Sequence, residues 1–204
     1  LELTFGRRNY EDERHWLYDT SIDVVRAGFR IGKFHTESFF GRENAVDITA
    51  FKRDPPNRIN TYLLYTDYRG IEDIRVAAYT IYRDDRSGAE GSPLTFGLRS
   101  QGNPLPALSY WTELAHMRGT DEFSREFSGY GLDVGGTYRF VDLPLNPNIT
   151  VGYAYGTGDG DPNDGTNHEF RQTGLQSNET KFGGVSEFKT YGEALDPELS
   201  NLHI

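Results

Sequence analysis

The sequence has no cysteine and no long apolar run, and these two absences exclude several classes of protein. Without cysteine there is no disulfide framework, no thiolate metal site and no cysteine nucleophile. No stretch approaches the ~20 consecutive apolar residues that a membrane-spanning helix needs, so a helical membrane protein is excluded. Lysine is also rare, with 4 residues against 17 arginines, and the formal net charge is −10.

The acidic balance argues against nucleic acid as a partner. The preference for arginine over lysine indicates paired charges in a confined space or an anionic ligand, because the planar guanidinium binds carboxylate, phosphate and sulfate groups bidentately. Ordinary surface arginines remain an equal alternative on composition alone. Aromatic residues and glycine are abundant, with 13 Tyr, 13 Phe and 23 Gly in 204 residues. This composition suits twisted sheets, tight turns and membrane interfaces better than helices.

Short runs that alternate apolar and polar residues are the most informative pattern in the chain, and the clearest covers residues 130–140. Leu132 and Val134 share one face of this predicted strand with aromatic residues at both ends. Asp133 and Arg139 fall on the opposite face, because side chains change sides at every residue of a strand. An apolar face with aromatic ends, opposite a charged face, is typical of a transmembrane β-barrel strand.

About nine such strands are predicted, with no domain boundary between residues 1 and 204. Short turn signals alternate with longer, charged connectors, which is the asymmetry of outer-membrane barrels. One outsized connector, a loop at about 157–198, is long enough to be functional or disordered. The predicted strands are 1–7, 20–28, 33–42, 59–68, 73–83, 94–99, 108–118, 127–140 and 149–156.

Two places in the strand pattern are irregular. The apolar residues of 21–29 switch from one face of the predicted strand to the other partway along it, which indicates a β-bulge or a wrong boundary. Phe39-Phe40 has the same irregularity. The first and last residues both read as strands, so we expect a segment of a longer barrel that lacks strands at both ends. A soluble β-sandwich would show similar short strands and stays an alternative.

Charged residues on the polar faces of these strands are candidates for a pore lining. A ring of guanidinium groups attracts anions, and carboxylates between them prevent permanent trapping. An equally weighted alternative is that arginines and carboxylates pair across the lumen and stiffen its wall. The candidates are Arg26, Arg75, Arg83, Arg99, Asp133 and Arg139.

No enzymatic signature and no cofactor site is found in the sequence. Asp159, Asp161 and Asn163 superficially resemble the oxygen ligands of a calcium loop. Pro162 interrupts this run and no bidentate glutamate follows at the twelfth position, so a flexible exposed loop is favoured. The five histidines lack metal-ligand spacing, so we expect no metal site.

Two strings resemble the alginate-export family of outer-membrane barrels. The first covers residues 170–178 and includes Arg171, Gln172 and Asn178; the second covers 191–202. The opening residues 3–26 are similar to the earlier strands of that family. The resemblance implies a barrel of about eighteen strands, of which this chain supplies about half. It also implies that the long loop gates the pore through Arg171, Gln172 and Asn178.

The leading interpretation is therefore an outer-membrane channel that exports an anionic, alginate-like polysaccharide through an arginine-lined pore. It would use no cofactor, contact outer-membrane lipid and work as a monomer, with periplasmic export components as possible partners. One alternative is a porin for general or small-organic-anion uptake. Another is a soluble β-sandwich that binds carbohydrate, and a hydrolase is least favoured because no carboxylate pair can be nominated.

Overall fold

The computed structural model describes residues 1–11, 19–42, 59–86, 91–161 and 163–171, which form one ten-stranded sheet without any helix. Within these residues there is accordingly no helix of the length and hydrophobicity needed to cross a membrane. The strands are β1 (Glu2–Glu11), β2 (Asp19–Ile31), β3 (Phe34–Arg42), β4 (Ile59–Ile71), β5 (Ile74–Asp85), β6 (Ser92–Leu105), β7 (Leu108–Thr120), β8 (Glu126–Arg139), β9 (Asn148–Gly156) and β10 (Thr166–Asn167).

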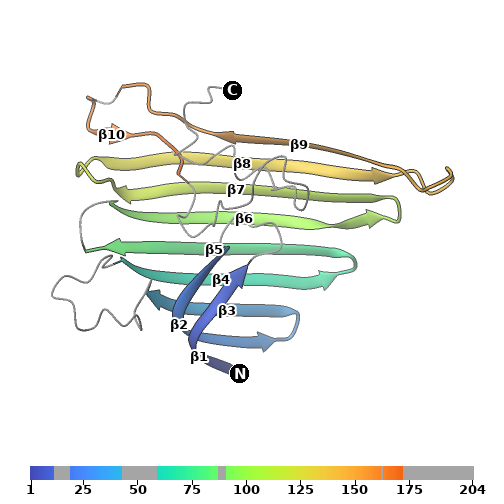
Figure 1. Ribbon diagram of the computed structural model, residues 1–204, viewed down its shortest axis with the longest axis horizontal. Helices are drawn as coiled ribbons and strands as arrows, with labels where there is room; N and C mark the ends of the chain where they lie inside the picture. Colours follow the sequence, from blue (N-terminus) through green and yellow to red (C-terminus); the bar gives the residue numbers. More distant parts are fainter. Residues whose placement is uncertain (12–18, 43–58, 87–90, 162, 172–204) are drawn as a thin grey trace.

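Strands β1 to β9 form an antiparallel meander in which each strand pairs with the next one along the chain (Figure 1). All nine predicted strands are present, which confirms the prediction of an all-β antiparallel fold. The hairpins that join β2 to β3, β4 to β5, β6 to β7 and β8 to β9 lie at the same end of the sheet, on the right in Figure 1. We call this the short-turn end and the other the long-connector end.

Two details of the strand prediction are wrong. The predicted strand 94–99 is too short, because β6 continues to Leu105 and the turn lies at Pro106-Ala107. The pairing of β6 with β7 shifts register between Gly102 and Leu105, and this irregularity accommodates Pro104, which has no N–H for a ladder bond. Strand β10 was not expected, and it pairs in parallel with the first residues of β8.

Of the two explanations for the irregular pattern of 21–29, the bulge is absent, and the strand extends beyond the predicted 20–28 to Asp19–Ile31. Pairing with β1 and with β3 is continuous over the whole irregular segment. The change of parity arises because both faces of the sheet are apolar there: Val24 is buried and Val25 is exposed. Phe39 and Phe40 repeat this arrangement, with 4% and 42% of their surface exposed.

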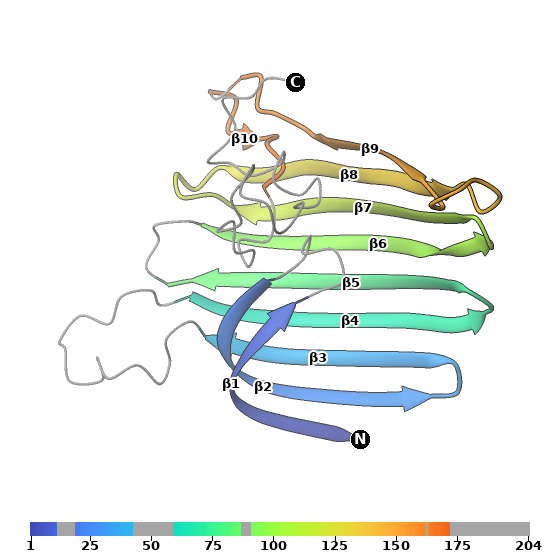
Figure 2. The ribbon, with the colours of Figure 1, turned by 45° about the vertical axis from the view of Figure 1, so that its right-hand side comes forward.

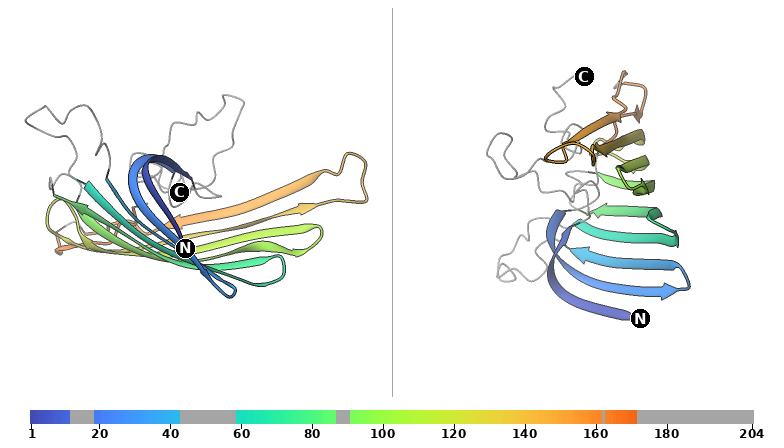
Figure 3. Two further views of the ribbon diagram at one scale, coloured as in Figure 1. Left: turned by 90° about the horizontal axis from the view of Figure 1, so that it is seen from below. Right: turned by 90° about the vertical axis from the view of Figure 1, so that its right-hand side faces the viewer.

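The sheet is strongly curved, and β1 and β2 curl over one side of it (Figure 3). We call the face that carries the buried side chains of Leu63, Tyr79 and Met117 the inner face. The opposite, outer face carries large exposed hydrophobic side chains from β1 to β9, such as Phe5 and Val151. No second sheet covers the outer face within the described residues, which disfavours the sandwich alternative. Curvature and an exposed apolar exterior are the properties of a barrel wall.

Aromatic side chains on the outer face gather toward both ends of the strands. Phe40 and Tyr62 pack with their ring centroids 5.1 Å apart near the long-connector end, and Tyr82 continues this row. Phe34 and Tyr68 pack at 4.9 Å near the short-turn end. Between these rows the outer face is largely aliphatic, with Leu98, Leu114 and Leu132 directly opposite one another. Two aromatic rows flanking an aliphatic band match the exterior of a membrane barrel.

Candidate functional site

The inner face is polar in the half nearer the short turns. A single cross-strand row runs from β2 to β9, with each member directly opposite the next in the neighbouring strand. Its members are Arg30, His35, Asp67, Ala77, Arg99, Glu113, Asp133 and Ala154. Opposite residues in a sheet are close enough for their side chains to interact, so this row brings charges from six strands into one line.

The centre of the row is a buried ion pair between Arg99 and Glu113. Their side chains are 5% and 1% exposed, and Arg99 Nε donates to Glu113 Oε2 over 2.7 Å. Glu113 also lies directly opposite Asp133, which is fully buried. The indole Nε1 of Trp111 donates to Asp133 Oδ1 over 3.0 Å. The partners of these two adjacent carboxylates include one guanidinium and one indole N–H.

Two further clusters extend this pattern toward β2. Asp67 is buried and accepts hydrogen bonds from the guanidinium of Arg69, and it lies 3.2 Å from Nδ1 of His35. In the next rows toward the long-connector end, Arg26 pairs with Glu37 and, at 3.1 Å, with Glu2. The charges of the polar half thus stiffen the wall by pairing, as the alternative interpretation of the sequence expects.

All six predicted pore-lining residues lie on the inner face, as their registers require. They do not form one ring. Arg99 and Asp133 are buried in the central row, and Arg26 belongs to the cluster with Glu37. Arg75 lies nearer the short turns, Arg139 is exposed at the short-turn end of β8, and Arg83 lies toward the opposite end of β5.

The other half of the inner face is largely apolar, although the strand pattern predicted a polar face lining the lumen. Tyr79 and Ile81 share the inner face of β5 with Arg75 and Arg83. They belong to a buried cluster that includes residues from β1 to β5, from β7 and β8, and one residue beyond β10. Its members are Tyr10, Ile22, Val24, Phe39, Leu63, Tyr79, Ile81, Ala115, Met117, Phe127 and Phe170.

Phe170 reaches this cluster because residues 157–171 fold back across the start of β8 (Figure 2). The backbone N–H of Phe170 donates to the carbonyl of Thr157 over 2.8 Å, and the Thr157 hydroxyl donates to the carbonyl of His168 over 2.6 Å. The Phe170 ring lies against Gly131, where a Cβ would come within 2.5 Å of it. A glycine on the inner face therefore provides the space in which this ring packs.

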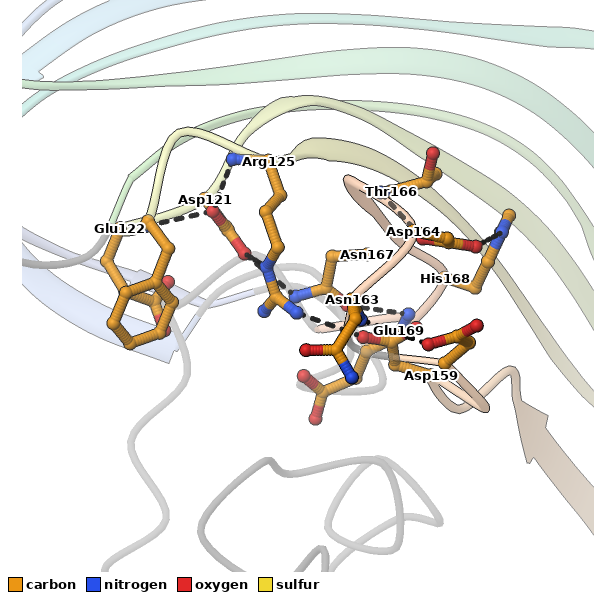
Figure 4. A network of polar contacts seen from close by, with 12 residues as sticks. Asp121, Glu122, Arg125, Asp159, Asn163, Asp164, Thr166, Asn167, His168 and Glu169 are labelled. Atoms are coloured by element: carbon orange, nitrogen blue, oxygen red, sulfur yellow. Dashed lines mark hydrogen bonds and ion pairs between the residues drawn. The ribbon is translucent and has the colours of Figure 1, made fainter.

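A polar network fastens the returning segment to the β7–β8 hairpin (Figure 4). The Asp121 carboxylate accepts hydrogen bonds from the backbone N–H groups of Phe123 and Arg125, from Arg125 Nε and from the Asn167 amide. Arg125 also donates to Asp159 Oδ2 over 3.2 Å. One carboxylate thus joins the hairpin to β10, and one guanidinium joins it to the end of the β9 connector.

Arg171 makes the second attachment. Its guanidinium donates to both carboxylate oxygens of Glu122, over 2.9 and 3.3 Å, and its Nε donates to Glu169 over 3.0 Å. It also lies over the ring of Phe127, 5.2 Å from the centroid. Bidentate guanidinium–carboxylate geometry fixes orientation as well as distance. We call the set Asp121, Glu122, Arg125, Asp159, Asn167 and Arg171 the clamp.

Two other predicted groups can be placed only in part. Gln172 and Asn178 lie outside the described residues. Of the calcium-loop residues, Asp159 pairs with Arg125, whereas Asp161 Oδ1 accepts the backbone N–H of Asn163 in an exposed turn. Within the described ranges no group of three or more His, Cys, Asp or Glu residues is arranged to hold a metal ion.

We expect Gly131→Val to release residues 166–171 from the inner face. The new side chain would occupy the space of the Phe170 ring, so the Arg171–Glu122 pair would lose the packing that supports it. Trypsin cleavage after Arg171 should then accelerate about tenfold, corresponding to ~1.4 kcal/mol of local opening. Gly158→Ala is the matched control, because a Cβ at Gly158 meets nothing within 4 Å. Equal cleavage of the two variants would contradict the packing role of Gly131.

The clamp should also be sensitive to acid. Burial would raise the pKa of Asp121, but the backbone N–H of Arg125, the Asn167 amide and the Arg125 guanidinium hold it below its ordinary value. Burial would also raise the pKa of Glu122, but the hydrogen bond from Arg171 holds it below its ordinary value. Both carboxylates therefore stabilise the clamp when ionised. This stabilisation is complete above the ordinary values of 3.8 and 4.5 and is lost as the pH falls through the lower folded values.

Spin labels at His168→Cys and Arg86→Cys, two exposed positions in a chain without cysteine, would test this. We expect one narrow distance distribution at pH 5, and one that broadens as the pH falls below the ordinary value of 3.8. Glu122→Gln should broaden the distribution at neutral pH as well. A distribution that stays narrow in both experiments would show that the clamp does not hold the segment.

Sequence reasoning missed Glu113, Trp111 and Glu122. Glu113 and Trp111 have the inner-face parity of the predicted strand 108–118, so alternation could have found them once the register with β8 was known. Glu122 carries no signal in the sequence, because it meets Arg171 49 positions later through tertiary folding.

Comparison with known proteins identifies one family and two relatives that share a name. The sequence model of the alginate export family matches residues 1–204. The chain is 38% identical over 241 aligned residues to the alginate production protein AlgE of Pseudomonas aeruginosa, covering 98% of this chain and 47% of that protein. It is 42% identical over 69 residues to the alginate production protein AlgE of Azotobacter vinelandii, covering 31% of this chain and 14% of that protein.

The chain thus spans about half the length of the Pseudomonas relative. A family of export proteins agrees with the prediction that the chain is not an enzyme, and it confirms the resemblance noted in the sequence. On the match over its whole length, this chain belongs to the alginate export family.

Proposed function

We propose that the protein containing this chain is an outer-membrane channel that exports an anionic, alginate-like polysaccharide. The inner face would form about half of the pore wall, and the remaining strands would close the barrel. No cofactor is required, because passage along a pore needs no covalent intermediate. We further propose that the channel is a monomer.

The distribution of charge on the inner face carries this proposal. The chain has a net charge of −10, yet the strands place five arginines against three carboxylates on the inner face between the central charged row and the short turns. The arginines are Arg30, Arg69, Arg75, Arg99 and Arg139, and the carboxylates are Asp67, Glu113 and Asp133. The cluster of Arg26 with Glu37 and Glu2 lies on the long-connector side of the central charged row. A wall with excess guanidinium groups attracts anions, while the interspersed carboxylates keep binding weak enough for release.

The outer face supports the membrane location. Its aliphatic band between Phe40–Tyr62 and Phe34–Tyr68 would contact lipid tails, with the rings at the two interfaces. We place the short turns in the periplasm and the long connectors outside, following the usual asymmetry of these barrels. Cargo would then enter at the short-turn end, where periplasmic export components could deliver it.

Two roles can be assigned to the predicted site residues within this proposal. Arg26, Arg99 and Asp133 act through pairing and hold the wall rigid. Arg75, Arg83 and Arg139 line the pore and contribute to its positive potential. The clamp holds residues 157–171 against the inner face near the long-connector end, so Arg171 anchors the start of a gating segment that includes Gln172 and Asn178.

Conductance of the full-length protein in a planar bilayer tests the function. We expect a reversal potential that indicates anion selectivity under a salt gradient, and block of the current by uronate oligosaccharides. Anion selectivity without uronate block would favour the small-organic-anion porin. Cation selectivity would contradict the proposal.

A further inference from the structure

A hollow of about 560 Å³ lies on the short-turn side of the central charged row, between the ends of β5, β6 and β7. Its polar lining includes Arg69, Asp73, Arg75, Gln101, Asn103 and Ser109, and Tyr110 and Trp111 also line it. Arg75, Gln101 and Trp111 are directly opposite one another in three successive strands. The hollow therefore combines two guanidinium groups, one carboxylate, amides and two aromatic rings.

Trp111 is held in one orientation. Its Nε1 donates to the fully buried Asp133, and its ring lies over Gly135, where a Cβ would come within 2.2 Å of Cζ2. The side chain is half-buried, so part of the ring remains accessible from the hollow. A fixed aromatic surface binds flat apolar groups with little loss of conformational entropy.

One of the two guanidinium groups of the hollow is held in place. Arg69 is held by hydrogen bonds to the buried Asp67. Arg75 lies two strands from Trp111, ~10 Å at the usual strand spacing. Two linked sugar rings span such a distance. The amide N–H of Gln101, which lies between them, can donate to a hydroxyl group, whereas its Oε1 is buried.

From this arrangement we propose that the hollow is a saccharide subsite for a uronate polymer, an inference that rests on the proposed export function. Trp111 stacks against the C–H face of one sugar ring. The guanidinium of Arg75 pairs with the carboxylate of the neighbouring sugar, and Gln101 binds a hydroxyl group between them. Because the hollow opens at the short-turn end, it receives the polymer before the polymer reaches the central charged row.

The test is current block in planar bilayers containing the full-length protein in one orientation. A uronate hexasaccharide and a neutral glucose hexasaccharide are added in turn to the short-turn side and to the other side. The variants are Trp111→Ala, Trp111→Phe and Arg75→Gln. Arg83→Gln is the matched comparison, because it removes the same charge from the inner face of the same strand near its other end.

We expect the uronate to block at a lower concentration from the short-turn side. Trp111→Ala should raise the half-blocking concentration there about tenfold for both sugars, and Trp111→Phe should restore most of the loss. Arg75→Gln should raise it for the uronate alone. Arg83→Gln should reduce anion selectivity while changing the half-blocking concentration from the short-turn side less than about twofold.

Block of the parent channel with equal effects of Trp111→Ala, Arg75→Gln and Arg83→Gln would overturn the subsite and leave the export function standing. If the unsubstituted channel shows neither anion selectivity nor uronate block, both the subsite and the export function are overturned. Unchanged single-channel conductance and heat-resistant migration on gels would show that each variant is folded.

Discussion

Replacing Arg99 with methionine is expected to lower the free energy of unfolding by about 3–5 kcal/mol, the usual cost of removing one partner of a buried ion pair. Arg99 and Glu113 are 5% and 1% exposed, so water cannot replace the lost guanidinium. The substitution also removes a guanidinium from beside Glu113, which lies directly opposite the fully buried Asp133. Like charges opposite one another in a sheet repel, and here the repulsion is not screened by solvent.

Denaturant titration of the full-length protein in lipid vesicles would measure this effect. Arg139→Met is the control, because Arg139 lies on the same face but is exposed, and we expect it to cost less than about 0.5 kcal/mol. The double variant Arg99→Met/Glu113→Leu should recover much of the loss, since apolar replacements of a buried pair are often neutral. An Arg99→Met cost as small as that of Arg139→Met would show that the pair is hydrated and contributes little.

Replacing Leu132 with arginine is expected to cost about 2–4 kcal/mol, the penalty for a guanidinium at the midplane on the lipid face of a barrel. Leu132 lies in the outer row with Leu98 and Leu114, between the two aromatic rows. Val134→Arg, one outer-face position closer to the short turns, should give a similar or slightly smaller loss. The same titration in vesicles provides the measurement.

Thr137→Arg is the paired control on the inner face of β8. Thr137 shares a hydroxyl contact of 2.8 Å with Thr150, so its replacement should cost about 1 kcal/mol or less, the value of one hydrogen bond. A large difference between the two faces would support a lipid-facing exterior. Equal costs at Leu132 and Thr137 would contradict a lipid-facing exterior. They would instead support a sheet that is covered by protein on both faces.

The fold was predictable to the extent that it depends on local alternation. In 130–140 every second residue is apolar, and the structure places Val134 on the outer face and Asp133 on the inner face, as predicted. The predicted strand ends were less accurate. For example, β6 continues through Pro104 at a register shift that no local sequence pattern indicates. The irregular pattern of β2 was interpreted as a bulge or a wrong boundary, because alternation assumes that only one face is apolar.

The sequence pattern predicted which face of the sheet carries the candidate site residues, but it did not predict which of these residues pair with one another. Parity put Arg99 and Asp133 on the inner face, but pairing of Arg99 with Glu113 depends on the register of β6 with β7. Whether an arginine attracts cargo or braces the wall depends on such partners and on burial. The roles of Arg75, Arg83 and Arg139 remain predictions that the conductance experiments test.

The sequence by itself determined the meander and the faces of its strands, because turn residues and the two-residue period of a strand act over a few neighbouring positions. Its family strings also determined the membership that comparison with known proteins confirmed. The tertiary structure alone decided that half of the inner face is apolar and that Phe170 packs on Gly131. It also decided that Arg171 meets Glu122, because contacts between residues 39 or 49 positions apart depend on how the sheet curves and how the chain returns across it.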